Sequence, residues 1–187
     1  MREYSLVLRV WHWLFAFTLF GMAATVILRK TFLSWRTNSQ VIIDKLNEFG
    51  IEIAADQAAT IAKAIRAPMW EWHIILGYVL VFLLLVRIAM VLKKGFEYPT
   101  DTDLHKKLVY IGYKVVYAML IMIAIAGVVL NQKDLFEFSK DTLHSIKEFH
   151  EILSFIFLGF IPLHIIGVVV AEIKKDKGII SSMISGN

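Results

Sequence analysis

The sequence predicts an all-α fold, a transmembrane four-helix bundle with an extra amphipathic helical loop between the first two spans. The 187-residue chain is 58% hydrophobic, and its mean hydropathy of +0.64 is well above that of a typical soluble domain. About 20 apolar residues cross the hydrocarbon core of a bilayer, and four stretches of the chain reach that length. These stretches are residues 6–28, 72–92, 108–130 and 149–171.

The first stretch is expected to remain in the mature protein as a spanning helix. It is too long and too aromatic for a cleaved signal sequence, and no convincing small-residue cleavage site follows it. We therefore interpret residues 1–187 as a single membrane-embedded domain of four spans, with no room for a large soluble enzyme.

The longest connection, residues 29–69, contains two short segments with apolar residues at helical spacing. The segments are residues 39–49 and 56–66, and Ser39 and Asp56 suit helix N-caps. Such amphipathic helices lie on a membrane surface or over the bundle, and they also serve as docking surfaces for partner proteins. We favour the first interpretation, although amphipathicity alone does not separate the two.

The topology and the distribution of basic residues predict the orientation of the chain. The other connections, residues 93–107 and 131–148, are short, and a tail follows at residues 172–187. Four spans put both termini on one side of the membrane. Lys and Arg are slightly denser on that side, which favours a cytoplasmic location for both termini.

The composition excludes several kinds of cofactor and partner. The chain has no cysteine, which excludes disulfides, iron–sulfur clusters, thiolate zinc sites and covalent c-type haem. Its net charge of +4 is modest and is spread over the loops, so it shows no nucleic-acid footprint.

Four of the six histidines lie in the predicted spans, where a costly imidazole indicates function. His150 and His164 are fourteen residues apart in the last span. At about 100° and 1.5 Å per residue they share one helix face and are separated by roughly 21 Å along the axis. That distance is too large for one metal ion and suits two sites at different depths. By topology, His12 lies at the depth of His164 and His73 at the depth of His150.

Two neutral imidazoles that face each other inside a four-helix bundle suit the iron of haem b. We therefore expect two non-covalent bis-histidine haems, one held by His12 and His164 and the other by His73 and His150. Filled axial positions leave no open site for oxygen or substrate, so each cofactor would only transfer electrons. Two haems at different depths in the bilayer would form an electron path across it, and this transfer would be coupled to the membrane potential.

Three cations within the spans are candidate partners for the anionic haem propionates. Arg9, Arg87 and Lys114 all lie at the depth of the histidine pair nearer the N-terminal side. The alternative is that these side chains snorkel to lipid phosphates, which needs no cofactor.

Other interpretations of the histidines remain open. A single membrane histidine can satisfy an interhelical hydrogen bond, but four in two depth-matched pairs fit that explanation less well. A haem-free zinc or copper transporter would place carboxylates, cysteines or methionines beside the histidines along a polar path, and the spans contain few of these. His105 and His144 fall in connections among charged residues, where a solvated side chain is the ordinary explanation.

Several motifs of the spans and of the tail match a known pattern. They are the run RVWHW at residues 9–13, His73 with Gly77 and Arg87, the run FHE at residues 149–151, the pair Leu163 and His164, and the tail GIISSMISG at residues 178–186. With these motifs the chain resembles the bacterial di-haem cytochrome b-561 family, which is related to the b-type cytochrome subunits of nickel–iron hydrogenases. The resemblance covers all four spans. It implies a four-helix core that holds two b-type haems through the four span histidines, electron exchange with ubiquinone or menaquinone, and cytoplasmic termini.

We therefore interpret the chain as a quinone-linked electron-transfer oxidoreductase of the bacterial inner membrane. Its partners would be membrane lipid, the quinone, and a redox protein or a small oxidant or reductant such as superoxide on the periplasmic side. Alternatively, the chain is the cytochrome b anchor subunit of a larger periplasmic dehydrogenase or hydrogenase complex. A stoichiometric second polypeptide would indicate the anchor.

Overall fold

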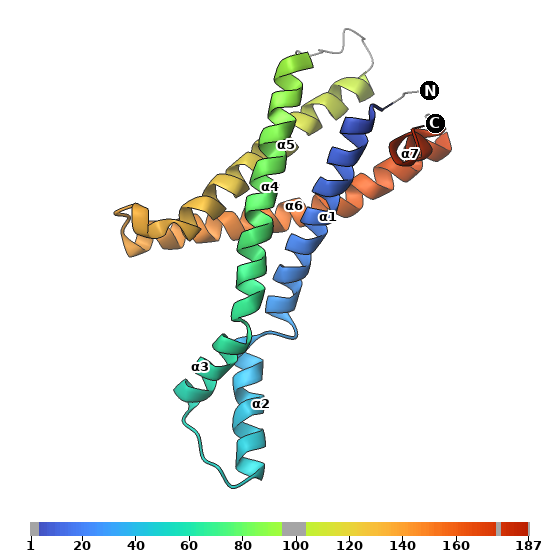
Figure 1. The fold of residues 1–187 in the computed structure, drawn as a ribbon. Coiled ribbons are helices and arrows are strands. Elements are labelled where there is room, and N and C mark those ends of the chain that lie inside the picture. The colour runs from blue at the N-terminus through green and yellow to red at the C-terminus, as the bar shows by residue number, and fades with distance from the viewer. Residues whose placement is uncertain (1–3, 95–103, 175–176, 187) are drawn as a thin grey trace. The chain divides into compact units, whose positions relative to one another are not determined.

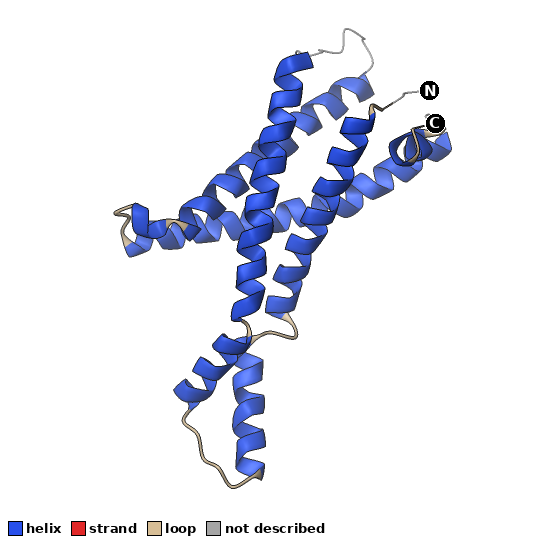
Figure 2. Cartoon of the chain, in the orientation of Figure 1, coloured by secondary structure: helices blue, strands red, loops and turns tan. Residues whose placement is uncertain are grey.

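The protein is described by a computed structural model that covers residues 4–94, 104–174 and 177–186, with the side chains of residues 94 and 104–106 outside the description. Within these ranges the chain forms helices and turns and contains no strand (Figure 2). The helices are α1 (Leu6–Lys30), α2 (Trp35–Glu48), α3 (Ala55–Ile65), α4 (Ala67–Lys94), α5 (Leu104–Asn131), the short 3₁₀ helix η1 (Lys133–Leu135), α6 (Lys140–Lys174) and α7 (Ile179–Ile184).

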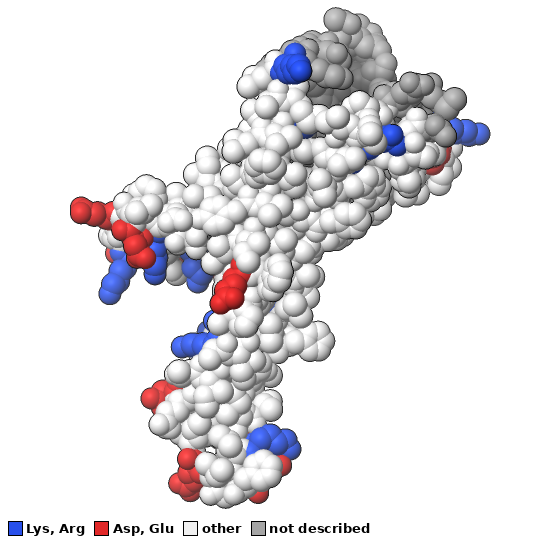
Figure 3. All heavy atoms as spheres, viewed as in Figure 1, with Lys and Arg blue, Asp and Glu red and all other residues white. Residues whose placement is uncertain are grey.

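Among the described residues, four helical stretches are long and apolar enough to cross a membrane, as predicted. Their surfaces are largely apolar and exposed: Leu163 of α6 is 67% exposed and Phe82 of α4 is 63% exposed. On the face drawn in Figure 3, charged side chains are sparse over the long helices. A helix that is hydrophobic on its outer side is expected where lipid is the solvent. The stretches are Leu6–Lys30, Ala55–Lys93, Lys107–Asn131 and Lys140–Lys174.

The chain divides into two compact units, which are described separately. One consists of residues 1–16 and 80–187, and the other of residues 17–79. Because α1 and α4 are continuous, each of these two helices belongs partly to one unit and partly to the other.

In the first unit, α5 and α6 are joined through the short helix η1, where the chain reverses its direction (Figure 1). The two helices run antiparallel and pack against each other. Leu120 and Ile123 of α5 and Phe157 of α6 are buried there. The first residues of α1 join the last turns of α4 through the buried indole of Trp11, whose Nε1 donates to the carbonyl oxygen of Leu83 at 2.7 Å. This bond satisfies the only polar group of a large apolar side chain.

The C-terminal helix α7 is attached at both of its ends within the same unit. The carboxylate of Glu172 accepts the backbone N–H groups of Gly178 and Ile180 at 2.8 and 2.9 Å, which satisfies two donors at the start of the helix. Gly178 has φ +88°, a conformation that glycine adopts without strain. At the other end, Trp13 Nε1 of α1 donates to the carbonyl oxygen of Met183 at 3.2 Å.

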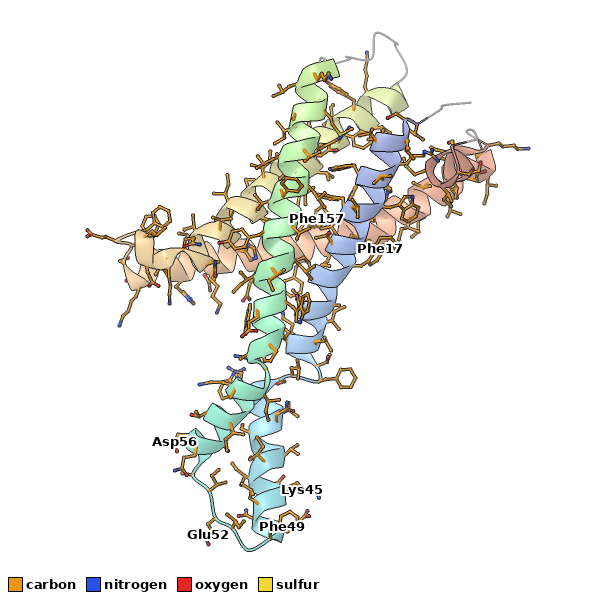
Figure 4. The ribbon with its side chains drawn as sticks, viewed as in Figure 1. Phe17, Lys45, Phe49, Glu52, Asp56 and Phe157 are labelled. Atoms are coloured by element: carbon orange, nitrogen blue, oxygen red, sulfur yellow. The ribbon has the colours of Figure 1, made fainter. Side chains whose placement is uncertain are left out.

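In the second unit, α1 and α4 run antiparallel and approach closely at Gly21. A Cβ atom placed on Gly21 would lie 2.9 Å from Leu76 Cδ1, so a side chain there would displace the end of Leu76. Beyond the end of α1, α2 and α3 form a helical hairpin that packs on the fully buried Ala58 and Ala62. Figure 4 shows Phe49 near its tip, where the side chain is 76% exposed.

The ends of several elements differ from the prediction. Helix α2 begins at Trp35 after Ser34, so Ser39 lies inside the helix and is not its N-cap. Helix α3 begins at Ala55 after Ala54, so Asp56 lies in the first turn. The start of a helix depends on where the chain leaves the preceding turn, and a favourable cap residue marks that position only to within a few residues.

Two predicted connections are shorter than expected because the spanning helices extend into them. Helix α6 begins at Lys140, so His144 is helical rather than in a loop, although it is exposed and pairs with Glu148 at 3.3 Å. His105 lies in the first turn of α5, and its side chain is outside the described residues. The rest of the predicted connection at residues 93–107 lies largely outside them as well.

Candidate functional site

The imidazoles of His12 and His164 face each other in the first unit. Their ring centroids are 6.4 Å apart, with 52° between the ring planes. Helix α1 supplies one ring and α6 the other. This separation is larger than that of two imidazoles joined by a direct hydrogen bond and suits one atom bound between the two rings.

The spacing of these two rings fits one metal ion bound by both. With a metal–nitrogen bond of roughly 2 Å and a ring nitrogen about 1 Å from its centroid, two axial imidazoles have centroids roughly 6 Å apart. The observed 6.4 Å matches this value. A rotation between the two ring planes is allowed, since each imidazole turns about its own bond to the metal. The pair therefore fits the axial ligand set of a bis-histidine haem.

Aromatic rings hold the two imidazoles of this pair in place. Trp13 lies edge-on to His12 with centroids 5.6 Å apart, and Phe160 stacks on His164 at 5.8 Å and 29°. No described residue hydrogen-bonds to either imidazole. The orientation of both rings therefore depends on packing rather than on a hydrogen bond.

His73, in the second unit, is oriented by a hydrogen bond to Thr25. The Oγ1 atom of Thr25 lies 2.8 Å from His73 Nδ1, and the same hydroxyl donates to the carbonyl oxygen of Met22 at 2.6 Å. A hydroxyl has one proton and a carbonyl oxygen only accepts. Both bonds can be made together only if His73 Nδ1 donates, which puts the lone pair of the neutral ring on Nε2.

His150, in the first unit, has the same tautomer for a related reason. Its Nδ1 lies 3.0 Å from the carbonyl oxygen of Ile123, which can only accept, so Nδ1 donates and the lone pair lies on Nε2. A Cβ atom on Gly127, one turn after Ile123, would lie 3.1 Å from Cε1 of this imidazole. Because Gly127 has no side chain, the imidazole of His150 lies close against α5.

His73 and His150 thus both show the arrangement that metal-binding histidines usually have. A ligating imidazole normally donates its other N–H to a protein acceptor, which fixes the tautomer and makes the ligating nitrogen more basic. The two residues belong to different units of the chain. That they bind one haem together stays a prediction.

Arg9, predicted to lie near the first histidine pair, contacts the C-terminal helix. Its Nη1 donates to the carbonyl oxygen of Ile184 at 3.2 Å, and a Cβ atom on Gly186 would lie 2.8 Å from the guanidinium carbon. Its Nε is buried and has no hydrogen-bond partner among the described residues. A buried donor of this kind suits an anion, because leaving it unpaired is costly.

The other two cations predicted to lie near this pair differ in their contacts. Arg87 contacts residues of other helices, and Lys114 contacts a residue of its own helix. Arg87 donates from Nε to the hydroxyl of Tyr117 at 3.0 Å and lies over the ring of Trp11, 5.3 Å from its centroid. Lys114 is exposed and lies over the ring of Tyr110, one turn earlier on α5, at 4.6 Å. Arg87 is thus tied to the residue that precedes His12, whereas the contact of Lys114 is local.

Three groups beside the histidines were not predicted from the sequence: Thr25, the carbonyl of Ile123, and Gly127. Thr25 was detectable as a polar residue in an apolar span, but threonine in a helix commonly bonds only to its own backbone. The carbonyl carries no sequence signal. Within the described ranges, no group of three or more His, Asp or Glu side chains is placed to hold a metal ion, so two-histidine sites are the metal chemistry that the described part of the chain offers.

Comparisons with known proteins agree with these findings. No curated protein and no solved structure matches the chain. A family model described as prokaryotic cytochrome b561 matches residues 3–186, which is nearly the whole sequence and includes all four spans. The chain therefore belongs to the prokaryotic cytochrome b561 family, a family of multi-pass membrane proteins that transfer electrons through b-type haem.

Proposed function

We propose that the chain transfers electrons across the membrane through two b-type haems, each bound by two histidines. His12 and His164 bind one iron, and His73 and His150 bind the other. His150 and His164 are fourteen residues apart on α6, roughly 21 Å along the helix axis, so one helix serves both sites. The haems supply reversible one-electron chemistry, while the chain's own residues hold the iron and set its surroundings.

The observation that carries this proposal is the 6.4 Å separation of the His12 and His164 rings. Interhelical hydrogen bonding does not explain it, because two imidazoles that bond to each other directly would lie closer together. The Nδ1 donors of His73 and His150 support the second site. In each of these rings the lone pair lies on Nε2, the nitrogen that would ligate the iron.

A haem-free transporter of zinc or copper is a poorer explanation. Zinc sites in proteins use three or four ligands, and the described residues hold no group of three. Two imidazoles on opposite sides of one ion instead suit a macrocycle that supplies the remaining ligands. An iron held by two of these histidines would have no open position for oxygen or substrate, so the bound haems would supply electron transfer alone.

We further propose that the chain lies in the bacterial inner membrane with both termini in the cytoplasm. Electrons enter from or leave to ubiquinone or menaquinone in the bilayer. The other redox partner is a protein or a small molecule such as superoxide on the periplasmic side. The buried Nε donor of Arg9 is a candidate partner for a haem propionate. Arg87 is a second candidate, because its guanidinium lies over the ring of Trp11, next to His12 in the sequence.

The test is haem quantification as the pyridine haemochrome on the purified full chain. We expect two haems per polypeptide in the wild type, and one in each of His164→Ala and His73→Ala. His144→Ala is the matched control, because this exposed histidine pairs with Glu148 on its own helix, and the variant should keep both haems. A wild-type chain without b-type haem, or histidine variants that keep both haems, would contradict the proposal.

A second measurement separates a self-contained oxidoreductase from the anchor of a larger complex. Purified chain that oxidises a quinol and reduces an acceptor by itself supports the first. A stoichiometric second polypeptide that co-purifies, with no quinol turnover by the isolated chain, supports the anchor. Both results are compatible with two haems, so this experiment leaves the haem assignment unchanged.

A further inference from the structure

Thr25 is a polar residue without an obvious structural need in the apolar helix α1. It is 6% exposed, and its hydroxyl is part of a chain of two hydrogen bonds. His73 Nδ1 donates to Thr25 Oγ1 at 2.8 Å, and Thr25 donates to the carbonyl oxygen of Met22 at 2.6 Å. A threonine that bonded only to its own backbone would make the second of these bonds and not the first.

The packing of α1 on α4 brings Thr25 to this position. Gly21 lies one turn before Thr25 on α1, and Leu76 lies one turn after His73 on α4. Leu76 Cδ1 would be 2.9 Å from a Cβ atom on Gly21, so the absence of a side chain at Gly21 leaves room for Leu76 of α4 against α1. The close approach and the hydrogen bond are therefore one local arrangement, which spans a single turn of each helix.

We propose that Thr25 is a positioning residue for His73, which fixes the ring as the Nδ1–H tautomer and directs Nε2 to the haem iron. This inference rests on the proposed function, since it assumes that His73 is an axial ligand. The hydroxyl that accepts from the ring also donates to a carbonyl, and such chains strengthen each member bond. A stronger bond at Nδ1 makes Nε2 more basic. More basic axial nitrogen stabilises the oxidised iron and lowers the reduction potential of that haem.

The test compares three threonine variants in the purified full chain with both haems loaded. Thr25→Val keeps the shape of the side chain and removes the acceptor, and Thr25→Ser keeps the hydroxyl. Thr31→Val, one residue beyond the end of α1, is the control, because the hydroxyl of Thr31 donates to the carbonyl oxygen of Ile27 and, among the described residues, contacts no histidine. The readouts are the two midpoint potentials, the α-band of each haem, and the rate at which haem transfers to apomyoglobin.

We expect Thr25→Val to raise one midpoint potential and shift one α-band component, while Thr25→Ser and Thr31→Val match the wild type. Haem should leave that site roughly 10- to 100-fold more readily, the usual effect of losing an outer partner of a metal ligand. The affected haem must be the one that His73→Ala removes. If Thr25→Val loses this haem completely, its spectrum should match that of His73→Ala, and Thr25→Ser should restore both haems.

Three results would overturn the inference. They are unchanged potentials and spectra in a fully loaded Thr25→Val chain, an effect on the other haem, or a Thr25→Ser chain that behaves like Thr25→Val. If Thr25→Val does not accumulate, Thr25→Cys takes its place, because sulfur is a weak acceptor and a smaller shift of the same sign is expected. A wild-type chain with fewer than two haems refutes the proposed function itself, which distinguishes the two failures.

Discussion

The two proposed haem sites hold their histidines by different means. His12 and His164 are placed by aromatic rings, and no described residue hydrogen-bonds to them. His73 and His150 each donate from Nδ1 to a protein oxygen. Packing limits where a ring lies but not which nitrogen carries its proton, whereas a hydrogen bond to an acceptor determines both. The difference implies that the first site is tuned mainly by nearby charge and the second by its hydrogen bonds.

The pairing of the four histidines gives the largest expected effect. His12→Ala with His164→Ala removes both ligands of one site, so this double variant should keep one haem. His12→Ala with His73→Ala removes one ligand from each site and should keep none. Haem-to-protein ratios by pyridine haemochrome distinguish the two outcomes. Equal haem content in the two double variants would show that the residues are paired differently.

The second largest effect is expected from a substitution where His150 lies close to α5. In Gly127→Ala the new methyl group would lie 3.1 Å from Cε1 of His150, so the ring must shift and its bond to the carbonyl of Ile123 must weaken. We expect haem to leave that site about tenfold more readily, as measured by transfer to apomyoglobin.

The control is Gly112→Ala on the same helix, where an added Cβ atom meets nothing within 4 Å. Alanine is a better helix former than glycine by about 1 kcal/mol, so both variants gain the same intrinsic preference. Only the contact with His150 differs between them. Equal haem transfer rates in the two variants would mean that this contact has no role in the site.

Much of the fold, and little of the detail around the histidines, was predictable from the sequence. Hydropathy located the four spans, because a long apolar run has few alternatives in a membrane protein. It placed the start of the last helix at residue 149 rather than at Lys140, since the polar first turns of α6 carry no hydropathy signal. Topology alone predicts the depth of each histidine, and the pairing of His73 with His150 stays a prediction. The contact of Thr25 with His73 depends on the register between α1 and α4, which no periodicity within one helix encodes.

The attachment of α7 beside the first site gives a smaller effect. Arg9 Nη1 donates to the carbonyl oxygen of Ile184, and Trp13 binds the same end of α7. An exposed hydrogen bond contributes about 1 kcal/mol net, so Arg9→Gln should raise the amide exchange rates of α7 roughly fivefold. If Arg9 also pairs with a propionate, the same variant lowers the potential of the haem bound by His12 and His164, because a nearby cation favours the reduced haem.

Arg9→Lys separates these two roles of the side chain. It keeps the positive charge and loses the guanidinium fork, so it should loosen α7 and leave the potential near that of the wild type. A potential that is unmoved in Arg9→Gln would assign Arg9 to the attachment of α7 alone.

The potentials of the two sites provide the finest test of the comparison. Arg9 lies one turn before His12 on α1, and Arg87 of α4 lies over the ring of Trp11, which precedes His12. No described residue hydrogen-bonds to the ring of His12 or His164. At the other site, two Nδ1 bonds make the axial nitrogens more basic. Both factors give the haem of His12 and His164 the more positive potential. A net difference of about 1 kcal/mol corresponds to roughly 40 mV for one electron. Redox titration of His73→Ala and His164→Ala, each with a single haem, assigns the two values, and a lower potential in His73→Ala would contradict this order.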